Sequence, residues 1–291
     1  MGTINQRPLK GFVRFDGQGR VVAGSLILRR KMPKVGKWQE ILGYECCNPT
    51  TTTTTTNVFN TTTTTTTAFC VTLGAASPFS VLGASTVTNT GTSVVIGDLG
   101  LSPGTSVTGF PPGIIVGTEH VTDTTAAAAQ IAAQAAYTCL TGLTPTSVLG
   151  ADIGSTLIMP GVYTFASSAT ITGPVTLNGG GDPNAYFVFI IPTTLTTATS
   201  ASVVLTNSAQ AGNIYWLVGT SATIGISTTM IGTIIADQSV TMNTSATLIG
   251  KAFALNAAIT LDTNIVNTVP CTINPCTDIS STTTTTSTPL R

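Results

Sequence analysis

The chain has 291 residues, enough for one large domain or two small ones; 42% are hydrophobic and only 8% are charged. Ordinary soluble domains carry about 25% charged residues, so the polar surface must come largely from Thr and Ser hydroxyls. Residues 1–47 carry nine basic and three acidic residues, a net charge of +6, whereas residues 71–270 carry one basic and seven acidic residues, a net charge of −6. This asymmetry predicts a basic head and an acidic body that could attract each other between molecules.

The head, residues 1–47, is predicted to be a small assembly module built on a β-hairpin. In GFVRFDGQGRVVAGSLILRR, two apolar runs flank the turn-forming residues 16–19. Basic residues cluster after the second run and are the candidate assembly contacts: Arg29, Arg30, Lys31, Lys34 and Lys37. A solvated or subunit-docking face is the preferred interpretation, and binding to nucleic acid is not expected.

Residues 48–70 contain two runs of seven Thr and are predicted to be a linker. Two alternatives remain open for this tract: mucin-like O-glycosylation, with Thr51 and Thr62 as candidates, and pairing as a strand with a neighbouring subunit. N-glycosylation sequons begin at Asn60 and Asn243. Residues 271–291 form a second Thr-rich segment, predicted to be a tail.

No secretory signal is recognisable at the start of the chain, and no segment approaches the roughly 18 apolar residues of a membrane span. The six cysteines include no CxxC pair, and a single His is too few to complete a Cys/His zinc site, so neither a metal nor a cofactor is expected. Cys271 and Cys276 could close a small disulfide loop if the compartment is oxidising. The sequence leaves the compartment open.

The body, residues 71–270, repeats itself. Apolar residues recur at spacings of 19, 18 and 19, and hydroxyl-bearing residues recur one and three positions before most of them. A short fixed period is typical of a solenoid, in which each coil stacks on the last and meets the same environment. Alternation then points the apolar column inward and the hydroxyl column outward. The inward column is Leu205, Ile224, Met242 and Leu261, and the outward positions include Val204, Thr223, Thr241 and Thr260, with Ser202, Ser221, Ser239 and Ala258 beside them.

One stretch of the body breaks the repeat and predicts a long helix over about residues 121–142. Asp123 or Thr124 can cap its start, Ala dominates its middle, and Gly142 lies near its end. Its apolar side is predicted to be Ala128, Ile131, Ala135, Leu140 and Leu143. Such a helix would lie along one wall of the solenoid.

Several sequence segments of the body resemble those of a known protein family. They include FSVLGASTVTNTGTSVVIGDLGLSPGTSVTGFPPG (79–113), the Ala-rich helix, MPGVYTF (159–165), GDPNAYFVFII (181–191), LTTATSASVVLTNSAQAGNIYWLVG (195–219) and KAFALNAAITLDTN (251–264). With these phrases the body, about residues 71–267, resembles the ice-binding proteins of cold-adapted bacteria, fungi and algae. The resemblance implies a mainly β fold: a right-handed, discontinuous, triangular β-solenoid with one long α-helix packed alongside. Residues 1–47 resemble N-terminal modules of structural proteins of large viruses and phages.

The resemblance also implies a way to bind ice, through one flat solenoid face that presents short hydroxyls and methyls. The repeat supplies the candidates for such a face: Ser221, Thr223, Ser239, Thr241 and Thr260. Outward-facing Thr also serves any exposed β-surface, so the repeat alone does not establish ice binding.

No catalytic residues are predicted, since polysaccharide-cleaving solenoids need clustered carboxylates with Arg or Lys. The Asp residues of the body are scattered and mostly suit turns. We therefore expect a non-enzymatic structural protein at an extracellular or virion surface, a self-associating subunit of a fibre, filament or virion decoration. The alternative is a true ice-binding protein that uses a Thr/Ser-rich face, and an adhesin for ice or glycans lies between the two.

Overall fold

A computed structural model describes residues 72–268 continuously, together with five short strands nearer the N-terminus. Three of these strands form an antiparallel sheet with β1 in the middle: β1 (Lys10–Arg14), β2 (Ile27–Arg29) and β3 (Trp38–Ile41). β1 and β2 pair in a register that joins Phe12 to Ile27, so the strands are further apart along the chain than the predicted turn at residues 16–19 implies, and β3 is an additional strand. Within the two Thr runs, β4 (Thr52–Thr56) and β5 (Thr61–Thr65) pair with each other in antiparallel register.

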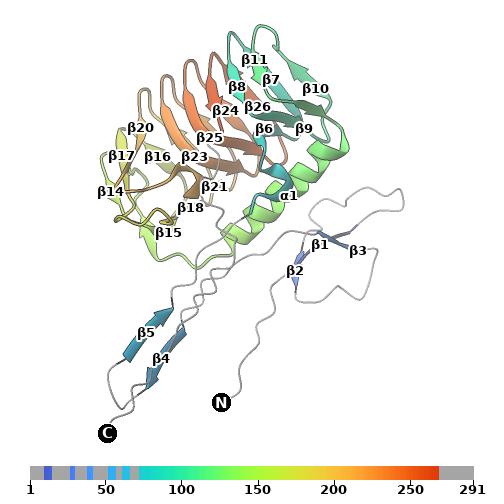
Figure 1. The fold of residues 1–291 in the computed structure, drawn as a ribbon. Coiled ribbons are helices and arrows are strands. Elements are labelled where there is room, and N and C mark those ends of the chain that lie inside the picture. The colour runs from blue at the N-terminus through green and yellow to red at the C-terminus, as the bar shows by residue number, and fades with distance from the viewer. Residues whose placement is uncertain are drawn as a thin grey trace.

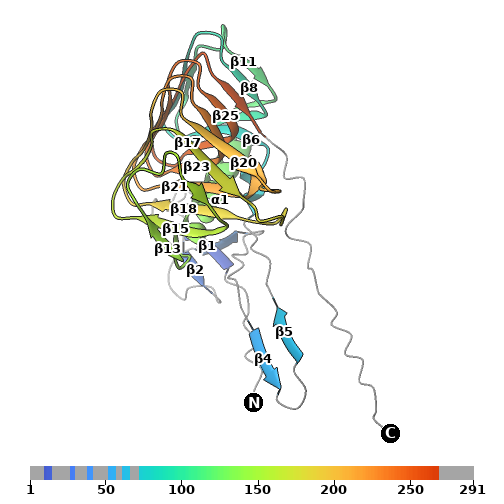
Figure 2. The same cartoon turned by 90° about the vertical axis from the view of Figure 1, so that its left-hand side faces the viewer.

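Residues 72–268 form a β-solenoid whose strands all pair in parallel with the coil above or below (Figure 1). The view turned by 90° shows its three-sided outline (Figure 2). We call the seven-stranded sheet the threonine face. In spatial order its strands are β10 (Ser106–Thr108), β7 (Thr86–Thr90), β26 (Ile259–Asp262), β24 (Val240–Met242), β22 (Ala222–Ile224), β19 (Leu195–Thr197) and β16 (Ala169–Ile171).

The other two faces belong to one continuous fifteen-stranded sheet, because the long strands β23 (Thr229–Ala236) and β25 (Thr247–Ala254) run through the corner between them. The part covered by the long helix is the helix face. Besides the C-terminal parts of β23 and β25, it contains β12 (Glu119–Val121), β9 (Asp98–Leu101), β6 (Phe79–Gly83), β21 (Ile214–Val218), β18 (Phe187–Ile191), β15 (Gly161–Phe165) and β13 (Ser147–Leu149).

The remaining part of that sheet is the third face. Besides the N-terminal parts of β23 and β25, it contains β11 (Ile114–Val116), β8 (Val94–Ile96), β27 (Ile265–Asn267), β20 (Ser202–Thr206), β17 (Pro174–Asn178) and β14 (Leu157–Ile158).

The order of coils in space is discontinuous. The first coils, β6 to β12, stack on the last one, because β6, β7 and β8 pair with β25, β26 and β27. The chain then returns to the other end of the stack and builds coils back toward its start. The discontinuous β-solenoid expected from the resemblance is confirmed.

The return is made by α1 (Thr124–Thr141), which lies along the helix face (Figure 1). The helix begins three residues later than predicted, since residues 119–121 pair as β12 with β9. Asp123 caps it: its carboxylate accepts a hydrogen bond from the Ala126 N–H at 2.7 Å. No helix in the described part of the chain is long and apolar enough to cross a membrane.

The side of α1 that packs on the sheet is made mostly of Ala, and it differs from the predicted side. Ala128 is exposed and Ile131 only half-buried, which corrects the prediction for those two residues. Small side chains let the helix backbone approach the sheet closely, so the larger apolar groups come from the sheet, among them Phe253 and Leu217. The buried helix residues are Ala126, Ala129, Ala132, Ala133, Ala135, Ala136 and Leu140.

Asp123 predicts a pH dependence of stability. Its hydrogen bond from the Ala126 N–H, followed by the one with His120, lowers the pKa of the carboxyl group below its ordinary value. A lowered folded-state pKa contributes stability that is present above the unfolded-state pKa and is lost as the pH falls through the folded-state pKa. We expect wild-type protein to lose more thermal stability below about pH 4 than Asp123→Asn, in which a non-titrating side chain still caps the helix. Parallel melting-temperature profiles from pH 7 to pH 2 would contradict this account.

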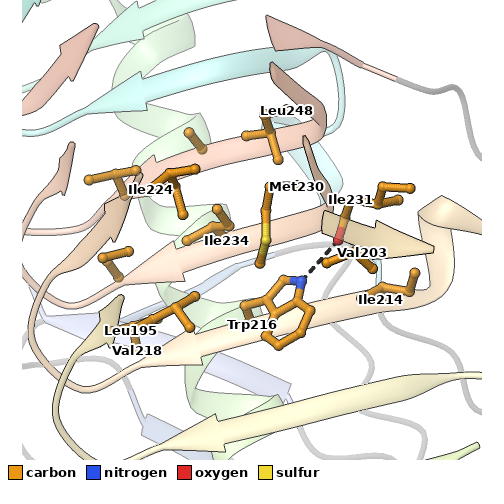
Figure 3. Packing of buried hydrophobic residues seen from close by; sticks show 14 of the residues in the cluster. Leu195, Val203, Ile214, Trp216, Val218, Ile224, Met230, Ile231, Ile234 and Leu248 are labelled. Carbon is orange, nitrogen blue, oxygen red and sulfur yellow. Dashed lines mark hydrogen bonds between the residues drawn. The ribbon is translucent and has the colours of Figure 1, made fainter. Parts of the chain in front are cut away.

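The solenoid interior is a continuous apolar core. Ile224, Met242 and Leu261 point into it, as the repeat predicts, and are fully buried. Trp216 lies in the same core beside Met230 and Ile234 (Figure 3), with its indole N–H donating to the Ile231 carbonyl oxygen at 2.9 Å. Leu205 was wrongly assigned to the same column: β20 lies on the third face, and the position that matches Ile224 one coil away is Thr197.

Two glycines pair where β23 and β25 turn the corner between the third and helix faces. Gly232 and Gly250 are in register, with φ of +112° and +153°. A Cβ on Gly250 would lie 1.9 Å from the Gly232 carbonyl oxygen, closer than any real contact. Only glycine therefore fits at these two stacked positions, 232 and 250.

Gly250→Ala is expected to lower the free energy of unfolding by about 3 kcal/mol, because it combines backbone strain with a clash against backbone. Gly181→Ala is the matched control: Gly181 also has positive φ (+87°), but nothing lies within 4 Å of an added Cβ. The control should cost about 1 kcal/mol. Equal losses in urea unfolding of the two variants would rule out the clash.

Candidate functional site

Seven threonines stand in one row across the threonine face, one from each strand. Thr88 pairs in register with Thr108 on one side and Thr260 on the other, and the row continues through Thr241 and Thr223. Thr196 and Thr170 complete it. We call these seven residues the threonine ladder. At about 4.8 Å per rung, the row is roughly 29 Å long.

The ladder points outward because its neighbours in each strand point inward. Val87, Val240 and Ile259 are fully buried, and strand alternation puts the next residue on the opposite side of the sheet. The same holds for the residues that precede Thr170, Thr196 and Thr223 in their strands. Thr88, Thr108 and Thr196 are exposed, and the other four ladder residues are half-buried.

A second row of small residues flanks the ladder, two residues before it in each coil, and all of them except Ala258 carry a hydroxyl group. Ser106 and Thr86 pair in register, and the Ser239 hydroxyl donates to the Ser221 hydroxyl at 2.8 Å. Positions two residues apart in a strand are about 6.7 Å apart. The two rows together form a regular grid of hydroxyl and methyl groups.

Charged groups stay at the border of this grid. Asp152 forms a bridge with Thr170 at one end, and Asp262 lies at the corner beside the ladder. The Asp152 carboxylate accepts hydrogen bonds from the Thr172 hydroxyl and the Gly154 N–H, which lower the pKa of this carboxyl group. The Asp262 carboxylate accepts a hydrogen bond from the Thr244 hydroxyl. Both carboxylates are thus satisfied locally, and the grid between them is uncharged.

The other faces do not offer such a regular surface. The helix face is covered by α1 (Figure 1). The third face carries mixed residues at its outward positions, with apolar side chains at one end and Thr, Ser and Pro further along. The exposed apolar residues at that end are Ile96 (37%), Ile114 (56%), Val116 (55%) and Ile265 (47%).

The one histidine of the chain lies away from the threonine face. His120 lies on β12, in the helix face, where its Nδ1 is hydrogen-bonded to Asp123 at 2.6 Å. Within the described residues, no group of three His, Cys, Asp or Glu side chains could hold a metal ion. What the grid can do is present a rigid, uncharged pattern of hydroxyls and methyls to an ordered layer of water.

All five residues predicted from the repeat lie on this one face: Ser221, Thr223, Ser239, Thr241 and Thr260. The repeat missed four ladder residues, Thr88, Thr108, Thr170 and Thr196. Their coils have other lengths, since 26 and 27 residues separate Thr170, Thr196 and Thr223, whereas 18 and 19 separate Thr223, Thr241 and Thr260. The signal that could have found them is a Thr directly after a small or aliphatic residue at or near the start of each strand.

The other predicted site residues fall mostly outside the described part of the chain. Arg29 ends β2 and Thr62 lies in β5. Asn243 is half-buried at a corner beside the threonine face, with its backbone N–H donating to the Ile224 carbonyl. The residues outside the described part are Arg30, Lys31, Lys34, Lys37, Thr51, Asn60, Cys271 and Cys276.

Comparison with known proteins places this arrangement in a family. Residues 81–267 match the family model described as "Ice-binding-like". An ice-binding protein of Nostoc sp. (strain HG1) is 50% identical over 197 residues, which cover 67% of this chain and 73% of that protein.

Solved structures agree with this match. The ice-binding protein of the Antarctic ascomycete Antarctomyces psychrotrophicus is 38% identical with a TM-score of 0.66, covering 67% of this chain and 97% of that one. An ice-binding protein from an Antarctic biological consortium is 43% identical with a TM-score of 0.67, covering 72% and 95% of the two chains. The chain therefore belongs to the ice-binding-like protein family. These similarities begin in the body and give no support to the viral resemblance expected for residues 1–47.

Proposed function

We propose that this protein is a non-enzymatic ice-binding protein that adsorbs to ice through the threonine face and acts outside the cell, where ice grows. The observation that carries the proposal is the threonine ladder, seven threonines in register within an uncharged grid. The ice-binding relatives support it, because their names describe the same activity.

A physical argument links the ladder to ice. Ice offers a fixed lattice of water molecules, so a rigid surface with regular polar and apolar groups can hold many of them at once without ordering loose side chains. The stacked coils supply that rigidity, since every rung is hydrogen-bonded to its neighbours. β-Branched Thr has few rotamers and therefore loses little side-chain entropy on binding.

This proposal takes the place of the structural-subunit reading of the sequence. The interpretation as a subunit of a fibre, filament or virion decoration depended on the charge asymmetry and on the resemblance of residues 1–47. The family match favours the ice-binding alternative instead. Self-association and glycan binding have no support in the described residues.

The test is thermal hysteresis and ice-recrystallisation inhibition by the purified full-length chain. We expect the freezing point to fall below the melting point, and crystals to take on facets, at micromolar protein. The same protein after unfolding should do neither, since the ladder exists only when the coils are stacked. Coincident freezing and melting points with folded protein would overturn the proposal.

A further inference from the structure

Buried polar side chains gather at one corner of the solenoid, between the threonine face and the third face. The backbone turns sharply there, and Ser227, Ser245 and Thr263 have positive φ of 54° to 61°. Carbonyl groups in such a corner have no strand partner and need donors from inside the protein. Five of the buried polar residues lie at this corner: Asn89, Ser93, Thr197, Thr228 and Asn264.

Asn264, which immediately precedes β27, is hydrogen-bonded to three coils that are neighbours in space. Its side-chain amide donates to the carbonyl oxygens of Asn243 at 2.8 Å and Ala246 at 3.1 Å, in the coil of β24 and β25. Its side-chain oxygen accepts from the Asp262 N–H at 2.6 Å, in its own coil. Its backbone N–H donates to the Ser93 hydroxyl at 2.8 Å, in the coil of β7 and β8. Each polar group of this fully buried side chain therefore has a partner inside the protein.

These bonds cross the seam, by which we mean the boundary between β26 and β7 where the last coil meets the first ones. The pairing across the seam puts Thr260 beside Thr88 in the threonine ladder. Asn264 and Ser93, which are 171 residues apart in the chain, are joined there. The Asn264 carbonyl oxygen also accepts from the Val94 N–H at 2.8 Å. Because the two segments are distant in the chain, their register depends on contacts such as these.

Elsewhere along the corner, threonine hydroxyls join one coil to the next. The Thr228 hydroxyl donates to the Ala198 carbonyl oxygen at 2.9 Å. The Thr197 hydroxyl accepts from the Gly225 N–H at 2.7 Å. Both bonds connect two coils that follow each other in the chain. Asn264 extends this arrangement over three coils, one of which comes from the N-terminal part of the solenoid.

We propose that Asn264 is a positioning residue for ice binding, an inference that rests on the proposed function. It fixes the corner where the strands of Thr241 and Thr260 leave the threonine face, because its hydrogen-bond partners at positions 243 and 262 follow these two rungs by two residues each. Through Ser93 it aligns both rungs with Thr88 across the seam. A working surface must be held within about 0.5 Å of its geometry, so a loosened seam would divide the ladder into two misaligned blocks.

The first test compares Asn264→Ala with Val266→Ala, two truncations of fully buried side chains two residues apart. Each should lower the melting temperature by about 5–10 °C. Near 0 °C, where both variants are folded, Asn264→Ala should need about threefold more protein for a given thermal hysteresis, because a site loosened by a fraction of an ångström loses affinity. Val266→Ala keeps every hydrogen bond at the corner and should match wild type.

Asn264→Ser is the conservative variant and is milder in its effect on folding. Its hydroxyl can still donate one hydrogen bond to a corner carbonyl, so it should recover part of the activity lost in Asn264→Ala. Wild-type activity in both Asn264 variants, or an equal loss in Val266→Ala, would overturn the proposal.

Hydrogen exchange separates failure of this inference from failure of the proposed function. The Thr263 N–H donates across the seam to the Thr90 carbonyl at 2.9 Å. The Ala222 N–H donates to the Ser239 carbonyl at 2.9 Å, in coils away from the seam. In Asn264→Ala, exchange at Thr263 should accelerate at least about tenfold more than exchange at Ala222, because the seam opens locally.

A merely structural role for Asn264 would accelerate both amides by one factor, because both would then exchange through global unfolding. Equal acceleration would therefore overturn the positioning role, whatever the ice assays give. Wild-type protein without thermal hysteresis would instead overturn the proposed function, and selective exchange at Thr263 would still show that Asn264 holds the seam.

Discussion

Thr241→Tyr is expected to reduce thermal hysteresis about tenfold while the protein stays folded. Thr241 lies in the middle of the ladder, between Thr223 and Thr260. A tyrosine ring there would stand above the plane of hydroxyls and methyls and hold the neighbouring rungs away from a flat lattice. Loss of a central contact in an interface typically changes affinity by a factor of ten or more. The measurement is thermal hysteresis against protein concentration.

The substitution should leave stability almost unchanged. Thr241 is half-buried with its side chain on the outer side of β24, and tyrosine is well tolerated in strands. Surface substitutions of this kind usually stay within about 0.5 kcal/mol. Equal melting temperatures for variant and wild type would show that the lost activity comes from the surface and not from unfolding.

Thr247→Tyr is the matched control. Thr247 is also a half-buried threonine, on the next strand of the same coil, but it faces outward from the third face, between Thr229 and Ile265. We expect it to keep wild-type thermal hysteresis. Full activity in Thr241→Tyr, or an equal loss in both variants, would show that the threonine face is not the ice-binding surface.

The sequence predicts the local part of this surface well and the long-range part poorly. Where coils have nearly equal length, as between Thr223, Thr241 and Thr260, a single spacing reveals both the inward and the outward column. Coil length depends on the number of residues in the corners, however. Because the earlier coils have longer corners, a search at a single spacing missed Thr170 and Thr196 and assigned Leu205 to the wrong face. Sequence periodicity therefore reveals only coils that follow each other along the chain at a constant length.

Pairings between distant segments carry no period at all. Thr88 joins the ladder only because β7 pairs with β26. The same junction explains the buried Lys251, the single basic residue of the body. Its ammonium group donates hydrogen bonds to the Ser77 and Phe79 carbonyl oxygens at the start of β6. Only the family resemblance predicted a discontinuous coil order. The ladder is thus completed by tertiary stacking, and its full length depends on the packing of the core beneath it.

An aromatic stack marks the centre of that packing. Trp216 stacks on Phe189 with ring centroids 4.1 Å apart and planes 10° apart, and Phe189 stacks on Tyr163 at 5.8 Å. The three residues are in register on β21, β18 and β15, so the rings continue from coil to coil. Figure 3 shows the indole ring among aliphatic side chains of neighbouring strands.

Trp216→Ala is expected to lower the free energy of unfolding by about 3–5 kcal/mol, the range for a large aromatic removed from a core. Trp216 is fully buried, so the variant leaves a cavity beside Phe189. It also removes the donor for the Ile231 carbonyl, whose bond to the indole is 2.9 Å long. Native domains are stable by only about 5–15 kcal/mol, so a large share of the stability would be lost. Urea unfolding measures the change.

Trp216→Phe separates the two contributions. It keeps a ring that can stack on Phe189 but loses the indole N–H, so we expect a loss of about 1–3 kcal/mol, from the orphaned carbonyl and the smaller ring. A loss below about 2 kcal/mol in Trp216→Ala would mean that the coils do not depend on this stack. If Trp216→Ala loses more stability than Trp216→Phe, as expected, thermal hysteresis of Trp216→Phe should stay at the wild-type value at temperatures where this variant is folded. The core would then govern whether the ladder exists, and the outward threonines would govern what it binds.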